Sequence, residues 1–346
     1  MGWYSIDAID VAFKRTKKIL IEPFNFWKWL KLAIIIFFIG GGIGNQGFNY
    51  NQGTFDTSRK EVEWPSFDEI FNQVGQFWQQ YQTHILIAVA FIILFILIFG
   101  FISSVMDFVF VESIVTDIVS IRAYFKKYLR PGFSLFIVRT IIGLVLLMLL
   151  ILAVMPILLP FIRSNAIITP GLILGSILWL ILILLVLALV NGILESFIGL
   201  CIPIMMYKDI GIIAALGKII ARFREEWRQI LVYWIIRIVV GLAAGILVGI
   251  VALIVLFGIL VPVILSGAIL YFILSGLGLG ISNILFWVVM ITYGLFAAIP
   301  LILFLLMASV PVPVFMKYHL LTFLHLWFKD VNIPFFDREK IEILNP

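Results

Sequence analysis

The sequence predicts an all-α, polytopic membrane protein that forms a single membrane domain over residues 1–346. Composition is the first reason: 63% of the residues are hydrophobic, only 12% are charged, and the mean hydropathy is +1.19. A soluble domain is nearer to about half apolar and about a quarter charged. Long apolar runs and an internal repeat are the other two reasons. Together they predict six transmembrane helices in three repeats, each a basic amphipathic interfacial helix followed by a two-span hairpin.

The apolar runs define the expected spans, because a run that can cross about 30 Å of hydrocarbon indicates a transmembrane helix. The first run is short and ends in a cluster of glycines at Gly40, Gly41, Gly42 and Gly44. Between the first two runs, residues 45–84 are polar and are expected to form an external loop that ends in an interfacial helix. The expected spans are 29–44, 85–110, 133–159, 172–206, 230–262 and 284–315.

Charge predicts the orientation, because lysine and arginine favour the cytoplasmic side of short loops. With six spans, the links 45–84, 160–171 and 266–283 share one side and hold 3 of the 24 basic residues and 5 of the 19 acidic ones. The other 21 basic and 14 acidic residues lie in the rest of the chain. We therefore expect a cell-membrane protein with both termini and the tail 319–346 in the cytoplasm. Asp7 and Asp10 argue against a cleaved signal peptide at the start.

The repeat is visible when the sequence is shifted by 98 residues, because LFIVRTIIGL (135–144) then aligns with YWIIRIVVGL (233–242). Arg139 falls on Arg237 and Gly143 on Gly241. Lys28 and Lys31 stand near the corresponding place in a third, weaker copy at the N-terminus. The predicted units are 1–111, 112–207 and 208–318.

Each unit is expected to begin with an interfacial helix that has one apolar face and one basic face. In the first copy Ser5 is the expected N-cap. The apolar stripes, at helical spacing, are Ile6, Ile9 and Phe13; Ile114, Ile118, Ile121, Phe125 and Leu129; and Ile212, Leu216, Ile219, Phe223 and Trp227.

Arg139 lies inside an apolar run, about 9 Å below the interface at 1.5 Å per residue. One reading is structural, with the side chain snorkelling or pairing with a carboxylate; Asp107, Glu112 and Glu195 fall at comparable heights. A second reading is contact with an anionic headgroup or solute, for which Arg139, Arg237 and Lys31 are the candidates. A third is a proton or ion pathway.

The sequence displays no motif for catalysis, and we expect no enzyme activity, no cofactor and no metal site. His319 and His325 are six residues apart, which does not match metal-ligand spacing, and the single cysteine, Cys201, excludes a disulfide framework. No phosphate-binding loop, zinc-protease or nucleophile-elbow motif occurs. Nucleic acid is not an expected partner.

One segment, IPIMMYKDIGIIAALGKIIARFREEWRQILVYWIIRIVVG, resembles the membrane domains fused to some glycerophosphodiester phosphodiesterases. The carriers are Pro203, Asp209, Ala214, Ala215, Trp227 and Trp234. The opening SIDAIDVAFKRTKK and the ending VPVPVFMKYHLL look similar to archaeal multi-pass membrane proteins of unknown function related to that domain. The resemblance implies a membrane topology and no site residues, and the catalytic barrel of the phosphodiesterases is absent.

Two functions follow as hypotheses. In the first, the protein is non-enzymatic and organises membrane lipids or a protein partner through basic helices that bind anionic headgroups on the cytoplasmic side. The partner is another membrane protein or further copies of this chain. In the second, it is a transporter or flippase-like carrier of an anionic substrate, a class that includes lipids, as internal repeats and intramembrane arginines suggest. A cavity shared by Arg139 and Arg237 would favour the second; closed salt bridges would weaken it.

Overall fold

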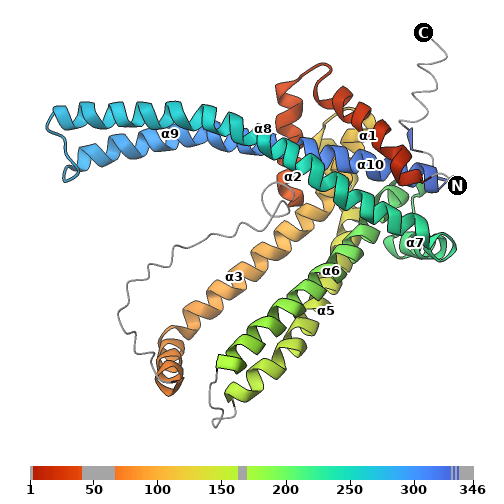
Figure 1. The fold of residues 1–346 in the computed structure, drawn as a ribbon, viewed down its shortest axis with the longest axis horizontal. Helices are drawn as coiled ribbons and strands as arrows, with labels where there is room; N and C mark the ends of the chain where they lie inside the picture. The colour runs from red at the N-terminus through yellow and green to blue at the C-terminus, as the bar shows by residue number, and fades with distance from the viewer. Residues whose placement is uncertain (1–2, 41–66, 163–169, 329, 332, 335–346) are drawn as a thin grey trace.

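The computed structural model describes residues 3–40, 67–162, 170–328, 330–331 and 333–334, and their regular structure is helical (Figure 1). The helices are α1 (Tyr4–Leu20), α2 (Phe26–Ile39), α3 (Phe67–Thr116), α4 (Ile121–Lys127), α5 (Leu129–Ile162), α6 (Pro170–Lys208), α7 (Ile212–Glu225), α8 (Trp227–Gly276), α9 (Ile284–Ala308) and α10 (Pro311–Trp327).

Among the described residues, five helical segments are long and apolar enough to cross a membrane, so the chain is a multi-pass membrane protein. They are Gly75–Thr116, Leu129–Ile157, Leu174–Lys208, Trp227–Gly276 and Ile284–Trp327. The first of the six expected spans, 29–44, is not among them. It corresponds to α2, whose 14 residues reach only about 21 Å. Gly40 ends this helix with a φ of 86°, and its N–H bonds back to the carbonyls of Ile36 and Phe37.

Several boundaries differ from the expected ones. Residues 67–84 are the first turns of α3, and residues 45–66 of the expected loop lie outside the described residues. The link 266–283 is mostly the end of α8. The sixth apolar run breaks after Ala308, and Pro311 occupies the first turn of α10. The expected tail therefore begins inside a helix, while residues 335–346 lie outside the described residues.

The outer parts of the long helices form what we call the arms: residues 75–99, 143–157, 174–190 and 246–305. Figure 1 shows α8 and α9 running side by side in one direction, while α3 and the pair α5–α6 run in another. Most of their side chains are apolar and exposed, and in each candidate span no more than 17% of the most apolar window is buried within the protein. Such a surface needs hydrocarbon as its solvent.

The helices converge in what we call the hub, the described residues of 3–40, 100–142, 191–245 and 306–334. The contiguous cluster of buried apolar side chains lies here. The inner ends of α3, α6 and α10 contact one another, and α1 packs along α10. Phe323 stacks on Tyr233 at 4.3 Å between ring centroids and on Trp327 at 5.5 Å, and all three rings are fully buried. Packing within the protein therefore holds the hub together.

The short helices of the hub differ in part from the expected interfacial helices. α7 buries its predicted stripe at Ile212 and Ile219. The second stripe is not one helix, because Asp117 adopts a left-handed φ of 63° and separates α3 from the short α4.

In α1 the small residues face the protein. Ser5, Ala8 and Ala12 are buried, while Ile6 and Phe13 are 48% and 63% exposed. Ser5 is not the N-cap; that position is Trp3. Small side chains let α1 approach α10 closely. In its stripe, Ile6 and Phe13 point outward, while Ile9 is partly buried against the core.

Candidate functional site

A groove of about 1810 Å³ opens where the hub meets the arms, between α2, α3, α5, α6, α8 and α10. Most of its wall is apolar and continues onto the arms through Leu97, Leu147 and Ile246. Charged side chains enter it from five helices: Asp107 (α3), Arg139 (α5), Glu195 (α6), Arg237 (α8) and Lys317 (α10). Arg139 and Arg237 therefore line the same groove.

Arg139 ties three helices together. One terminal nitrogen donates to Asp107 Oδ2 at 2.7 Å, and the other donates to Glu195 Oε2 at 2.9 Å. The two carboxylates are not equivalent, because the Asp107 side chain is 6% exposed and that of Glu195 is 43% exposed. Arg139 is thus anchored on a buried acid and meets a second acid at the open side of the groove.

Lys317 comes from α10 and completes the buried part of the cluster. Its Nζ lies 3.5 Å from Asp107 Oδ1 and 5.6 Å from the ring centre of Phe110. Asp107 therefore faces two cations, one on each oxygen. A buried carboxylate with this arrangement has its charge compensated without water.

Arg237 is held differently. Its NH1 donates to the hydroxyl of Tyr233, one turn earlier in α8, at 2.6 Å, and its guanidinium lies 5.8 Å from the ring centre of that tyrosine. Among the described residues it forms no salt bridge with a carboxylate. The Tyr233 ring in turn stacks on His319, whose Nε2 donates to the carbonyl of Ser5 at 2.9 Å. Arg237 is thus oriented by neutral groups and keeps donors for the groove.

The remaining predicted residues lie elsewhere. Lys31 is exposed on α2 and does not line the groove. Glu112 pairs with Lys127 at 2.7 Å and not with Arg139. The hydrogen bond that Lys127 donates to Glu112 raises the pKa of Lys127, so this lysine stays charged at physiological pH. Sequence reasoning missed Lys317, although a lysine inside the apolar segment PVPVFMKYHLL carries the same kind of signal as Arg139.

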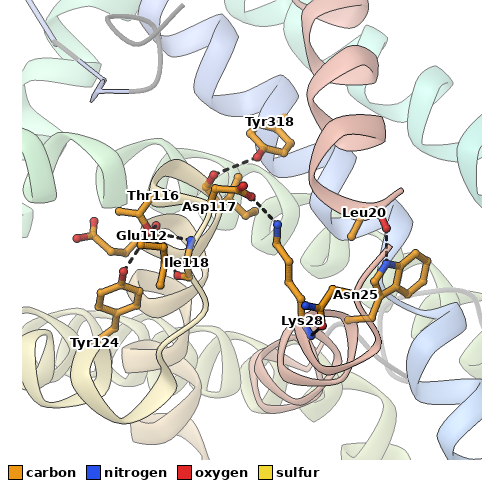
Figure 2. Close-up of polar contacts among 11 residues, drawn as sticks. Leu20, Asn25, Lys28, Glu112, Thr116, Asp117, Ile118, Tyr124 and Tyr318 are labelled. Atoms are coloured by element: carbon orange, nitrogen blue, oxygen red, sulfur yellow. Dashed lines mark hydrogen bonds and ion pairs between the residues drawn. The ribbon is translucent and has the colours of Figure 1, made fainter. Parts of the chain in front are cut away.

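Below the groove, hydrogen bonds fix the end of α3 to its neighbours (Figure 2). Lys28 at the start of α2 binds Asp117 at 2.6 Å, and the hydroxyl of Tyr318 in α10 donates to the carbonyl of Ile114 at 3.0 Å. The hydroxyls of Thr116 and Tyr124 are 3.1 Å apart and join α3 to α4. These contacts hold the end of α3 against α2, α4 and α10.

The chemistry available in the groove is electrostatic recognition. No group of three metal-ligating side chains occurs among the described residues, and Cys201 is buried in the hub, away from the groove. Clustered cations beside a long apolar wall suit a molecule with an anionic end and a hydrocarbon end.

In a comparison with known families, residues 3–333 match the "Family of unknown function (DUF7544)". The chain therefore belongs to this family. No curated protein and no solved structure matches it. The match agrees with the predicted resemblance to membrane proteins of unknown function and adds no activity.

Proposed function

We propose that this protein is a non-enzymatic integral membrane protein that holds an anionic membrane lipid in the groove between its hub and its arms. The observation that carries the proposal is that Arg139 and Arg237, from different hairpins, line one groove whose wall continues onto lipid-facing arms. An anionic head would lie at the hub and its hydrocarbon chains would follow the arms.

The two arginines are proposed to have different roles. Arg139 forms ion pairs with Asp107 and Glu195, so it holds the helices in place. Arg237 donates a hydrogen bond to a tyrosine hydroxyl and retains further N–H donors. A guanidinium presents several donors in a fixed fork that matches phosphate. The ligand contact is therefore assigned to Arg237.

The size of the groove supports a lipid over a small solute. Sites for drug-sized molecules measure roughly 300–1,000 Å³, and this groove is about 1810 Å³. It is bordered by side chains that face hydrocarbon, such as Leu144 and Leu147 of α5. A ligand could thus enter sideways from the bilayer without crossing water.

The alternative is a transporter or flippase-like carrier of the same class of ligand. The shared groove favours it, while the ion pairs that close Arg139 argue for a fixed scaffold. Holding a lipid needs no movement of these pairs, so it is the simpler proposal. Carriage is tested by whether the protein reconstituted in liposomes moves a headgroup-labelled lipid between leaflets.

The proposed setting is the cell membrane, with the hub on the cytoplasmic side. α1 and α10 pack on each other in the hub, so both ends of the described chain are proposed to lie on that side, although α2 is shorter than a span. We also propose that the chain consists of the three repeat units predicted from the sequence. A relation to the membrane domains of the phosphodiesterases and to their archaeal relatives is part of this proposal. Asp117 and Asp209, which follow α3 and α6, both have positive φ, 63° and 49°. α4 packs on α3, α7 on α6 and α1 on α10, so each short helix lies on the last helix of a hairpin.

Native mass spectrometry in mild detergent tests the proposal. We expect the wild type to retain an anionic lipid that Arg237→Gln loses. Arg228→Gln is the matched control, because Arg228 lies on the same helix, stacks on Trp227 and does not line the groove. If wild type, Arg237→Gln and the control all carry the same bound molecules, the groove is not a lipid site.

A further inference from the structure

We propose, resting on the function proposed above, that the groove selects a lipid whose head is a singly charged phosphodiester, and that Glu195 sets this limit. Arg237 is the phosphate contact and Glu195 is the specificity-determining residue. The inference comes from the arrangement of the five charged side chains in the groove.

The first step is the charge of the site. Three cations and two carboxylates line the groove, which leaves one positive charge without a partner. Asp107 lies between Arg139 and Lys317, and Glu195 takes the outer nitrogen of Arg139. The unmatched charge is therefore that of Arg237.

The second step is the effect of this charge on its neighbours. Arg237 and Arg139 both act on Lys317 as like charges. An anion at Arg237 would relieve that repulsion, and it would do so strongly because the surrounding wall is apolar and has a low dielectric constant. A head without net charge would leave the repulsion in place.

The third step is why one negative charge is preferred over two. Glu195 is the more exposed of the two carboxylates, at 43%, so an entering head meets this acid rather than buried Asp107. A phosphomonoester carries about −1.5 to −2 charges at neutral pH, and its second charge would face Glu195 without a cation to offset it. Repulsion of the wrong partner is a common source of specificity.

The fourth step is the path of the hydrocarbon chains. Gly241 and Gly245 follow Arg237 on the groove side of α8 at one-turn intervals. A Cβ on Gly245 would meet no atom within 4 Å, and one on Gly241 would meet only the end of Met316. The two glycines therefore leave open space on the groove side of α8 beside Arg237. Hydrocarbon chains attached to a head at Arg237 can lie in this space.

Titrations of delipidated protein with defined lipids, read by native mass spectrometry, test this. The probes share dioleoyl chains and differ in the head: phosphatidylglycerol (a singly charged phosphodiester), phosphatidic acid (a phosphomonoester) and phosphatidylcholine (zwitterionic). We expect the wild type to bind phosphatidylglycerol most tightly. Arg237→Gln should weaken it by at least about tenfold, as for loss of a charge-assisted hydrogen bond.

The decisive variant is Glu195→Gln, which keeps an oxygen for Arg139 and removes the negative charge. We expect it to raise the affinity for phosphatidic acid relative to phosphatidylglycerol by about tenfold, that is, about 1.4 kcal/mol. Glu225→Gln is the control, since Glu225 lies on α7 in an ion pair with Arg222 outside the groove, and it should leave the ratio unchanged.

The outcomes separate the two proposals. If Arg237→Gln loses phosphatidylglycerol but Glu195→Gln leaves the ratio unchanged, the lipid site stands and the selectivity by Glu195 is wrong. If the wild type binds phosphatidylcholine as tightly as phosphatidylglycerol, the charge argument is wrong. If no probe responds to Arg237→Gln, the proposed function fails, and this inference fails with it.

Discussion

The hub and the arms share the helices α3, α5, α6, α8 and α9 and yet follow opposite rules. In the hub, buried side chains pack in a continuous cluster and charged groups find partners across helices. In the arms, rows of leucine, isoleucine and valine are exposed, and α8 and α9 pack mainly on each other. The hub resembles the interior of a soluble protein, where burial drives packing. The arms rely on lipid. Lipid tails are as apolar as leucine, so no hydrophobic driving force favours burying an exposed leucine there.

A substitution should therefore cost more stability in the hub than in the arms. A change in the hub removes contacts that no solvent replaces, and a change in the arms exchanges protein for hydrocarbon at little cost. Substitutions paired between the two regions therefore test the division directly.

The largest effect is expected for Asp107→Ala. This change removes the acid that faces Arg139 and Lys317 and leaves both cations in a partly buried site. Breaking a buried ion pair from one side costs about 3–5 kcal/mol. We expect a clear loss of thermal stability in detergent, measured by loss of monodisperse protein after heating.

The control for this change is Asp10→Ala, on the exposed face of α1, where the carboxylate pairs with Lys14 and is 77% exposed. It should change the melting temperature little. Equal melting temperatures for the Asp107 and Asp10 variants would show that the buried cluster does not hold the hub together.

The next effect compares two isoleucines. Ile204→Ala in α6 empties a fully buried position and should cost about 2–5 kcal/mol, as for other core truncations. Ile254 on α8 is 67% exposed on an arm, and Ile254→Ala should cost much less because lipid fills the space. Heating each variant in lipid nanodiscs measures the difference. Similar costs for both would mean that the arms are packed against protein in the membrane.

A smaller effect separates two glycines of α5. A Cβ on Gly132 would lie 2.5 Å from Val105 Cγ2 and 2.9 Å from Val105 Cα, whereas one on Gly143 would meet nothing within 4 Å. Gly132→Ala should force α5 away from α3 and cost about 1–3 kcal/mol. Gly143→Ala should be neutral or stabilise the helix by up to about 1 kcal/mol. Opposite signs in the same stability assay would support the division, and a stabilising Gly132→Ala would contradict it.

The arms were the part of the fold that the sequence predicted well, because their signal is hydropathy alone. For the first expected span, apolar character continues up to Gly40 and gave no sign that α2 ends there after 14 residues. The second interfacial helix was mispredicted because the spacing from Ile114 to Ile121 continues across a break at Asp117. A left-handed aspartate leaves no signal in the apolar pattern.

The hub was harder to predict, because apolar side chains are buried in its interior but stay exposed where its surface meets lipid. In α1 the stripe of Ile6 and Phe13 indicated an interfacial helix, but it did not show that the small residues Ser5 and Ala8 pack on the protein. For the candidate site, counting residues from the interface placed Asp107, Arg139 and Glu195 at similar depth. It could not show that Arg237 and Lys317, from two other helices, enter the same groove, since that depends on how the hairpins are arranged.

The smallest effect concerns the ion pair between Lys127 and Glu112, at the rim of the hub. Lys127 is 56% exposed, so a double-mutant cycle with Lys127→Met and Glu112→Gln should give a coupling of at most about 1 kcal/mol, and less at high salt. Because the pKa of Lys127 is raised by its hydrogen bond with Glu112, its contribution is fully present below the unfolded pKa and is lost only as the pH rises through the higher folded pKa. The coupling should therefore be constant from about pH 6 to pH 9. A coupling as large as the loss of stability expected for Asp107→Ala, or one that changes within this pH range, would contradict this. It would place the pair inside the low-dielectric part of the hub and extend the hub outward to α4.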